Sequence, residues 1–412
     1  MPHLRWNRAF GAAGLLAALL LAAACGGGAQ SANGGGNSGL QVIQIATQSP
    51  LSGDESVQGI ALKNGAALKL KQEYDQFKAM GFDVRLDPQD DKGDPNTGVA
   101  NAQKLAADPQ VLAVVGHLDS GVMIPSEAQY HPAQLPIVSP ANTNPDVTSK
   151  YKYPEISRIC GRDDVQGPVG AIFAKDQLGV KTVFVIDNIT AYGTGVANAF
   201  KQKAQELGLQ VVGSQSVDKS ETDYSNVLTQ IQQKKPDLVY YGGLYQGFAL
   251  MLNQAAAKGI HTKWMGPDGV FSNGLVATAK ENAIGVYATS VAAPTDLTPG
   301  GKQFIDAYKA EYGDNPDPYA IYGYDAMGVV LQGLKDAIQK NGGKLPTRAQ
   351  VRDAIRAIKD YQGALVKVGF DDIGDNMYAG YYVYQITSAN ASTTGDAKLL
   401  AQYDPKGHRV GQ

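Results

Sequence analysis

Three short polar side chains follow apolar runs at positions suited to a small charged ligand. Ser120 closes the run that begins at Val111, and Thr143 closes the run that begins at Leu135. Asp268 stands alone in a glycine-proline loop just after a shorter run. Hydroxyl groups beside a helix N-terminus can bind a carboxylate, and a lone carboxylate can bind an ammonium group. Together these groups would complement a zwitterion through charge-assisted hydrogen bonds of about 1.5–3 kcal/mol each.

Each of these residues also has a purely structural explanation. Ser120 fits the N-cap of a helix that begins at Gly121, and capping residues are common where a strand turns into a helix. Asp268 fits an Asx turn within its own loop. The residue types alone leave the structural and the ligand-binding interpretations open.

The polar residues lie within two successive blocks of strand and helix patterns, at residues 40–161 and 162–290. Apolar β-branched runs of four to six residues, bounded by turn formers, are typical of buried parallel strands. Because strands that alternate with helices form parallel sheets, we predict an α/β fold with two doubly wound parallel-sheet lobes. Ser120, Thr143 and Asp268 would then lie beyond the carboxyl ends of strands, where open sheets bind ligands.

The chain continues with further elements after the second block. These are helical patterns over Tyr319–Gln339 and Arg348–Ile358, and strand-like runs over Leu365–Phe370 and Tyr381–Ile386. Late elements after two complete blocks indicate that the chain returns to the first lobe and then to the second. We therefore assign residues 40–161 and 291–366 to lobe 1, and residues 162–290 and 367–412 to lobe 2. Several crossings between two lobes are typical of a multi-crossover hinge.

The N-terminal residues predict a targeting segment. Arg5 and Arg8 precede the apolar stretch Gly11–Ala24, whose 14 residues fit a secretory signal. A membrane-spanning helix needs roughly 20 apolar residues, so this stretch is too short to be one. It ends Leu21-Ala-Ala-Ala24-Cys25, which resembles the bacterial lipobox and implies cleavage before Cys25 and lipidation of its thiol. The alternative is plain secretion with an incidental cysteine.

Residues 1–24 are thus the predicted lipoprotein signal peptide, and residues 25–39 the lipidated cysteine with a flexible linker. Half of the residues from Gly26 to Gly39 are glycine, which cannot build a core. With Cys25 lipidated, the other cysteine, Cys160, has no partner for a disulfide. We expect Cys160 to be a buried small hydrophobic residue.

Composition excludes several classes of function. The chain has 412 residues and a net charge of −3, so nothing in the charge balance indicates a nucleic-acid partner. The acidic segment Asp87–Asp94 lacks the ligand spacing of a calcium loop, so we expect a solvated turn and no metal. No dinucleotide, phosphate-loop, zinc-protease or nucleophile-elbow motif is present, so we expect no cofactor. His117 lies near Asp119 and Ser120, but a triad requires order in space rather than adjacency, and we expect a turn or core residue.

Five segments, in order along the chain, resemble the leucine/isoleucine/valine-binding proteins of bacterial transporters. They are Gly116–Ser120, Ser139–Pro145, Gly161–Pro168, Tyr240–Gly243 and Met265–Gly269. The similarity extends from about Val42 to Ile386. It implies a type I periplasmic binding protein fold, whose two lobes close on an amino acid and deliver it to an ATP-driven importer in the membrane.

The resemblance also implies roles for single residues. Ser120 and Thr143 would bind the α-carboxylate, whereas the backbone of Asn142 and the carboxylate of Asp268 would bind the α-ammonium group. Tyr192 matches the aromatic residue that closes over the ligand from the second lobe.

The predicted side-chain pocket differs from that of the well-known members. Tyr319 matches a pocket aromatic, and Leu118 belongs to the predicted ligand-binding set. Asp119 replaces a cysteine, whereas Gln58 and Leu244 stand where those members have tyrosine. The groups that bind the amino-acid backbone are therefore kept and the pocket is altered, and Asp119 can favour a polar or cationic side chain.

These observations predict an extracytoplasmic binding lipoprotein of an ABC importer rather than an enzyme. It would be a monomer that captures a branched-chain or related amino acid for its permease. It would lie in the cell envelope, lipid-anchored to the outer face of the cytoplasmic membrane or in the periplasm. One alternative, suggested by Leu244 and Gln58, is a ligand such as a small amide, urea or an aromatic acid. Another is a sensor that passes closure on to a membrane receptor.

Overall fold

The computed structural model describes residues 39–411, apart from 296–297, 299 and 390–396. The predicted signal peptide, Cys25 and the linker up to residue 38 lie outside the described residues. Within the described ranges, no helix is both long enough and apolar enough to cross a membrane.

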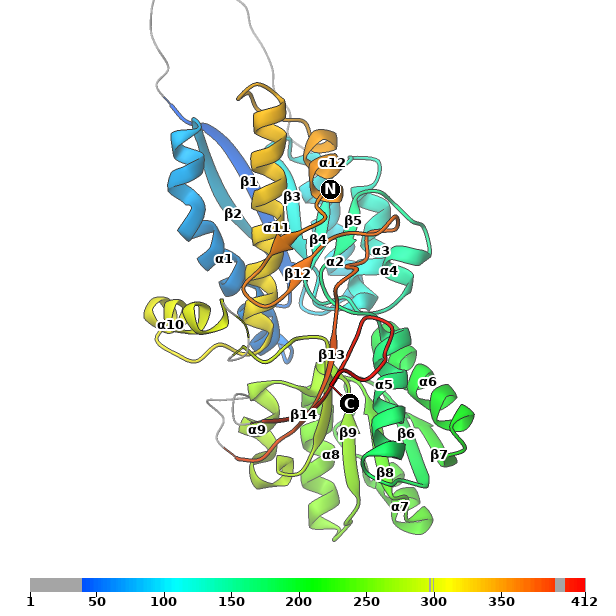
Figure 1. The fold of residues 1–412 in the computed structure, drawn as a ribbon. Helices are drawn as coiled ribbons and strands as arrows, with labels where there is room; N and C mark the ends of the chain where they lie inside the picture. Colours follow the sequence, from blue (N-terminus) through cyan, green and yellow to red (C-terminus); the bar gives the residue numbers. More distant parts are fainter. Residues whose placement is uncertain (1–38, 296–297, 299, 390–396, 412) are drawn as a thin grey trace, which may run out of the picture. The chain divides into compact units, whose positions relative to one another are not determined.

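The first sheet is entirely parallel, with strand order β2-β1-β3-β4-β5 (Figure 1). Its strands are β1 (Gln41–Ser49), β2 (Phe82–Asp90), β3 (Val111–Gly116), β4 (Ile137–Ser139) and β5 (Ile156–Arg158). The helices that connect or cover these strands are α1 (Ser56–Ala79), α2 (Pro95–Ala107), α3 (Ser120–Tyr130), α4 (Asp146–Ser149), α11 (Tyr319–Lys340) and α12 (Arg348–Arg356).

Helices α1 and α11 pack closely because glycine stands at their contact. A Cβ atom on Gly65 of α1 would lie 1.7 Å from the carbonyl oxygen of Ala320 in α11. In the same way, a Cβ atom on Gly323 would lie 2.0 Å from the carbonyl oxygen of Leu62. The late helix therefore belongs with the first sheet, although more than 200 residues separate it from α1 in the sequence.

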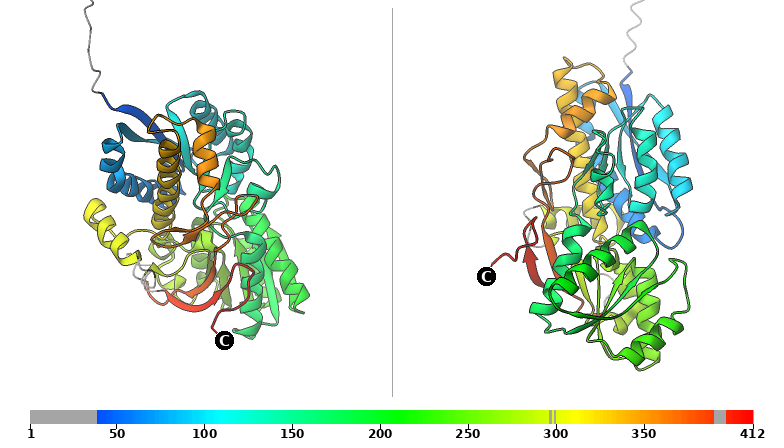
Figure 2. Two further views of the ribbon diagram at one scale, coloured as in Figure 1. Left: turned by 45° about the horizontal axis from the view of Figure 1, so that its top comes forward. Right: turned by 90° about the vertical axis from the view of Figure 1, so that its right-hand side faces the viewer.

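The second sheet has the order β14-β13-β10-β9-β8-β6-β7, and β13 runs antiparallel to both of its neighbours, β10 and β14 (Figure 2). Its strands are β6 (Thr182–Asp187), β7 (Gln210–Ser216), β8 (Leu238–Gly242), β9 (Lys263–Gly266), β10 (Tyr287–Ser290), β13 (Tyr381–Gln385) and β14 (Lys398–Tyr403). The helices from this part of the chain are α5 (Asp163–Asp176), α6 (Ala191–Glu206), α7 (Ser225–Lys234), α8 (Tyr245–Ala257) and α9 (Asn273–Ala279), with the short helix η2 (Lys280–Ala283).

Both parallel runs have the same winding, in which the first strand of each block lies between the second and the third. The predicted doubly wound α/β architecture is confirmed. The chain passes to the second sheet after β5, returns to the first after β10, and reaches the second again at β13 (Figure 1). These three passages form the predicted multi-crossover hinge, while the residue bounds of the two lobes stay a prediction.

One predicted strand is largely absent. Of Leu365–Phe370, only Lys367–Val368 (β12) pairs as a strand, with Tyr361–Gln362 (β11). The backbone N–H groups of residues 364–366 instead donate to the carboxylate of Asp325 at 2.7–3.0 Å. An apolar run predicts burial, but it does not reveal that a side chain will take the hydrogen bonds that a strand needs.

The acidic segment also differs from the prediction of a solvated turn. Strand β2 continues to Asp90, whose carboxylate accepts from the Leu51 N–H at 2.8 Å and the Ser52 hydroxyl at 2.6 Å. Asp94 caps α2 by accepting from the Thr97 N–H. These carboxylates thus hold neighbouring backbone in place. The sequence patterns did not predict several short elements or helix α10 (Gly301–Tyr312); the short ones are β5, β10, β11, β14, α4 and α9.

Candidate functional site

The carboxyl end of β3 leads directly into α3 and places Ser120 in the first turn of that helix. The predicted N-cap was wrong by one residue. Asp119 keeps extended backbone angles and holds the N-cap position, and its side chain does not cap the helix. Ser120 is buried, and its hydroxyl oxygen accepts a long hydrogen bond, 3.4 Å, from the Asn144 N–H.

Asn142 joins the loops that follow β3 and β4. Its Oδ1 accepts from the His117 N–H at 2.9 Å and from the Ser139 hydroxyl at 2.7 Å. Its Nδ2 donates to the carbonyl of Leu118 at 2.9 Å. The two loops that carry the predicted carboxylate-binding hydroxyls therefore form one unit.

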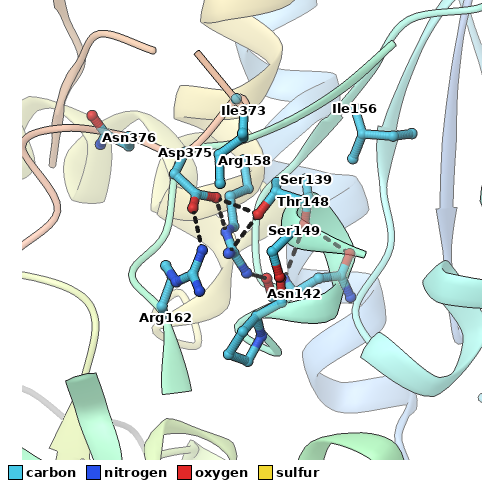
Figure 3. A network of polar contacts seen from close by, with 12 residues as sticks. Ser139, Asn142, Thr148, Ser149, Ile156, Arg158, Arg162, Ile373, Asp375 and Asn376 are labelled. Atoms are coloured by element: carbon cyan, nitrogen blue, oxygen red, sulfur yellow. Dashed lines mark hydrogen bonds and ion pairs between the residues drawn. The ribbon is translucent and has the colours of Figure 1, made fainter. Parts of the chain in front are cut away.

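A buried arginine, Arg158, contacts one of these loops (Figure 3). Arg158 donates from Nη1 to the carbonyl oxygens of Asn142 at 3.0 Å and Asn144 at 2.8 Å. Its Nε donates to Asp375 Oδ1 at 2.6 Å, and Arg162 donates to the other oxygen of Asp375 at 2.7 Å. Burial opposes ionisation of Asp375, but the positive charge and hydrogen bonds of Arg158, together with the hydrogen bond from Arg162, hold its pKa below the ordinary value.

The position of the Asn142 carbonyl bears on its predicted role. One lone pair of this oxygen is used by Arg158, and a carbonyl oxygen has two, so one remains for a ligand. Ala141, which was not predicted, lines the adjacent cavity. The role of the Asn142 backbone in binding an ammonium group stays a prediction.

Asp268 begins a short 3-10 helix, η1 (Asp268–Val270), after β9. Its carboxylate accepts from the hydroxyl of Tyr192 at 2.8 Å and from the hydroxyl of Tyr319 at 2.9 Å. The Tyr192 hydroxyl in turn accepts from the Gly269 N–H at 2.8 Å. Burial raises the pKa of Asp268, whereas hydrogen bonds from Tyr192, Gln166 and Tyr319 act in the opposite direction.

These contacts join elements that belong to different sheets. Tyr192 lies in α6 beside the second sheet, and Tyr319 begins α11 beside the first. Gln58 in α1 is fully buried and donates to the carbonyl oxygen of Gly269 at 3.2 Å. Asp268 and its neighbour Gly269 are therefore hydrogen-bonded to helices of both sheets.

A small cavity of about 10 Å³ lies beside Asp268. It is lined by Leu118, Asp119, Ala141, Tyr192, Leu244, Asp268 and Tyr319. Six of these seven residues are among the predicted site residues. Ser120, Thr143, Asn142 and Gln58 are buried nearby but do not line it. Pockets for drug-sized ligands measure about 300–1,000 Å³, so a ligand would enter this cavity only when the lining residues move apart.

The prediction missed two buried residues of α5, Asp163 and Gln166. Burial and the nearby charge of Asp268 raise the pKa of Asp163, whereas the hydroxyl of Thr143 acts in the opposite direction. Both residues lie in the segment Gly161–Pro168, so the signal was present in the sequence. Two adjacent acids begin that helix, and only the structure shows that Asp163 points inward while Asp164 is exposed.

The arrangement does not resemble a catalytic triad. His117 is fully buried, with Nε2 2.9 Å from the Tyr130 hydroxyl and Nδ1 3.5 Å from Asp91 Oδ2. This confirms a core residue rather than a base for Ser120. Across the ranges that the structure describes, no group of three or more potential metal ligands comes together. Cys160 is buried in the core, as predicted.

Comparison with known proteins gives consistent matches over nearly the whole described chain. A family model described as periplasmic binding protein matches residues 42–392. A Leu/Ile/Val-binding protein homologue of Brucella abortus is 31% identical over 336 residues, which make up 82% of this chain and 88% of that protein. The crystal structure of a leucine-binding protein from Thermotoga maritima matches with a TM-score of 0.78 and 27% identity, covering 87% of this chain and 98% of that one.

A solute-binding protein from R. palustris, solved in complex with benzoate, matches with a TM-score of 0.77. It is 19% identical and covers 90% of this chain and 98% of that one. At this identity the likeness shows a shared fold alone.

Proposed function

Because the chain belongs to the periplasmic binding protein family, as a substrate-binding protein of the Leu/Ile/Val-binding type for ABC transporters, we propose that it captures a free amino acid beside Asp268. Its fold is the type I periplasmic binding protein fold, as the resemblance implied. The family acts in the periplasm or cell envelope, and its members bind rather than transform their ligands. The observation that carries the proposal is a buried carboxylate at a small cavity next to two hydroxyl-bearing loops.

The proposed pose divides the ligand's two charges between the two sheets. The α-carboxylate would lie near the Ser120 hydroxyl and the N-terminus of α3, where free N–H groups favour an anion. The hydroxyl of Thr143 would be a further hydrogen-bond donor to the α-carboxylate. The α-ammonium group would lie against Asp268, whose ionised carboxylate has about four acceptor positions. The two tyrosines use two of these, and Gln166 uses a third.

We propose that binding stabilises a closed arrangement of the two lobes. Tyr319 contacts Asp268 and Gln58 contacts Gly269, so both bonds join elements of different sheets next to the cavity. At the rim, the Tyr245 hydroxyl and Gln246 Nε2 donate to the carbonyl of Asp54 at 3.2 and 2.7 Å. A ligand that bonds to both sides would shift the population toward closure.

The test is a thermal-shift screen of ligand-stripped protein against the twenty amino acids. A ligand that binds only the folded state stabilises it by about 2.7 kcal/mol at a concentration of 100 times its Kd. We expect at least one amino acid to raise Tm and to produce binding heat in calorimetry. The methyl ester and the N-acetyl derivative of the same amino acid serve as controls, because each removes one of the two charges.

Two outcomes would contradict the proposal. If no amino acid changes Tm or produces heat, the protein does not bind free amino acids. If benzoate or a small amide binds instead, the ligand class predicted as the alternative is correct. Genetic loss of uptake for the bound amino acid, without loss of a signalling response, separates transport from sensing.

We further propose that the protein is tethered by lipid at Cys25, through the linker up to Gly39. Replacement of Cys25 by serine should release the mature protein into the soluble fraction, because a lipidated thiol supplies the membrane affinity. Mass spectrometry of the N-terminal peptide should show a lipid adduct in the wild type and none in the variant. The matched control is Cys160→Ser, which leaves the lipobox intact, and equal membrane recovery of wild type and Cys25→Ser would exclude the anchor.

A further inference from the structure

Three buried acceptor oxygens lie next to the predicted side-chain pocket without a donor. Within the described part of the chain, Asp119 Oδ2, Glu55 Oε2 and Gln58 Oε1 have no hydrogen-bond partner. Gln58 already uses its Nε2 on Gly269, so its remaining polar atom is an acceptor. Leaving a buried polar group unsatisfied costs about 1–3 kcal/mol, and more for a charged group.

The first two of these oxygens belong to carboxyl groups in mutual contact. Asp119 lines the cavity beside Asp268, and its carboxyl group is within hydrogen-bonding reach of that of Glu55. Two ionised carboxylates cannot donate to each other, so the pair needs either a shared proton or an external donor. A second pocket, of about 290 Å³, is lined by Glu55.

Leu244 lines both the inner cavity and this second pocket. Its side chain offers no donor to the acid pair. Leu244 and the unpaired carboxyl oxygens of Asp119 and Glu55 thus lie where the two pockets adjoin. A ligand side chain that extends past Leu244 would reach the contact between Asp119 and Glu55.

We infer that this cleft selects amino acids whose side chain ends in a nitrogen donor, namely an ammonium, guanidinium or carboxamide group, and that Asp119 determines the selection. The inference rests on the proposed function, since it assumes that the α-carboxylate and α-ammonium groups are bound as described. An N–H donor from the ligand would satisfy acceptors that an aliphatic side chain would leave buried and unpaired. The pocket therefore favours donor-ended side chains over branched aliphatic ones.

The charged groups around Asp119 allow a second test of the inference, which is the release of protons when a ligand binds. Asp119 faces Glu55 from the loop before α1, Asp91 from the loop after β2, and Lys219 from the loop after β7. Burial first, and then Glu55 and Asp91, raise the pKa of Asp119 well above its ordinary value, while Lys219 opposes them. Lys219 Nζ lies 3.6 Å from Glu55 Oε1 and donates to the Gly93 carbonyl at 2.8 Å. A cationic side chain would displace the shared proton, so its binding should release protons.

Calorimetry with matched ligand pairs tests the inference. Lysine is compared with norleucine, and glutamine with methionine, because each pair differs mainly in the terminal donor. We expect at least one donor-ended amino acid to bind about tenfold or more tightly than its partner, because a site built for hydrogen bonds rejects an analogue that lacks them. Lysine binding should also release protons, measured from the dependence of the heat on buffer ionisation, whereas norleucine binding should release none.

Variants assign the effect to Asp119. Asp119→Leu should remove the preference and the proton release while norleucine binding is kept or improved. Asp119→Asn should keep glutamine binding and weaken lysine binding, which covers the case in which Asp119→Leu does not fold. Asp306→Leu, which removes an exposed acid from α10, is the control for charge and should change neither.

Two results would overturn the inference. If norleucine or leucine binds as tightly as lysine and glutamine, or if Asp119→Leu leaves the preference unchanged, Asp119 does not select the ligand, and the proposed amino-acid receptor stands. If no amino acid binds at all, the proposed function fails, and this inference fails with it.

Discussion

The Asp268→Ala variant is expected to lose amino-acid binding by about a hundredfold to a thousandfold. Removing one partner of a buried charge pair costs about 3–5 kcal/mol, and each 1.4 kcal/mol is a factor of ten in Kd. Asp268 is the only acid that both lines the cavity and has two tyrosine hydroxyls bonded to it in the described structure. Asp119, the other acid that lines the cavity, contacts Glu55 instead of the tyrosines.

Calorimetry on the best ligand from the screen measures this loss. Glu127→Gln is the matched control, because Glu127 is also a buried acid, with its pKa raised by burial to about 8, but it does not line the cavity. Its affinity should equal that of the wild type. Asp268→Asn distinguishes the ligand classes, since unchanged affinity in this isosteric variant would mean that the ligand carries no ammonium group.

The sequence was sufficient to predict the winding of both sheets. Strands such as Val111–Gly116 and Leu238–Gly242 are continuous apolar runs, and that pattern requires burial on both faces. Within each sheet the carboxyl ends of the strands then had to meet at one edge, which placed Ser120 at that edge of the first sheet and Asp268 at that edge of the second. Local pattern and global fold agree at these positions.

The features of the fold and site that the sequence did not predict depend on tertiary contacts. Asp325 takes the backbone hydrogen bonds of residues 364–366, so a run that reads as a strand becomes a connection. The choice between Asp163 and Asp164 depends on the rotation of α5, which a pair of identical residues cannot reveal. Glu55, the partner of Asp119, lies 64 positions earlier in a loop, and no spacing rule connects the two.

The Asp375→Ala variant is expected to be less stable than the wild type by about 3–5 kcal/mol at neutral pH. Arg158 is fully buried, and its Nε donates to Asp375 at 2.6 Å, so the variant would leave a buried guanidinium without its carboxylate (Figure 3). Urea denaturation of the ligand-free proteins measures the difference. The control is Asp306→Ala, which breaks the exposed pair with Lys302 and should cost only about 0.3–0.5 kcal/mol.

The pH dependence of this difference tests its electrostatic origin. The folded-state pKa of Asp375 lies below the ordinary value of about 3.9, so its contribution is present above that pH and is lost as the pH falls through the lowered pKa. The difference in unfolding free energy between wild type and Asp375→Ala should therefore decrease at acid pH. A gap that stays constant down to about pH 2 would indicate lost packing instead.

The same substitution should also weaken ligand binding, although Asp375 does not line the cavity. Arg158 fixes the carbonyl oxygens of Asn142 and Asn144, on either side of Thr143, and Asp375 lies on the third passage of the chain between the sheets. Without Asp375, the guanidinium loses its orientation and the loop loses its support. An unchanged Kd in a folded, destabilised variant would mean that Arg158 supports the hinge but does not position the loop.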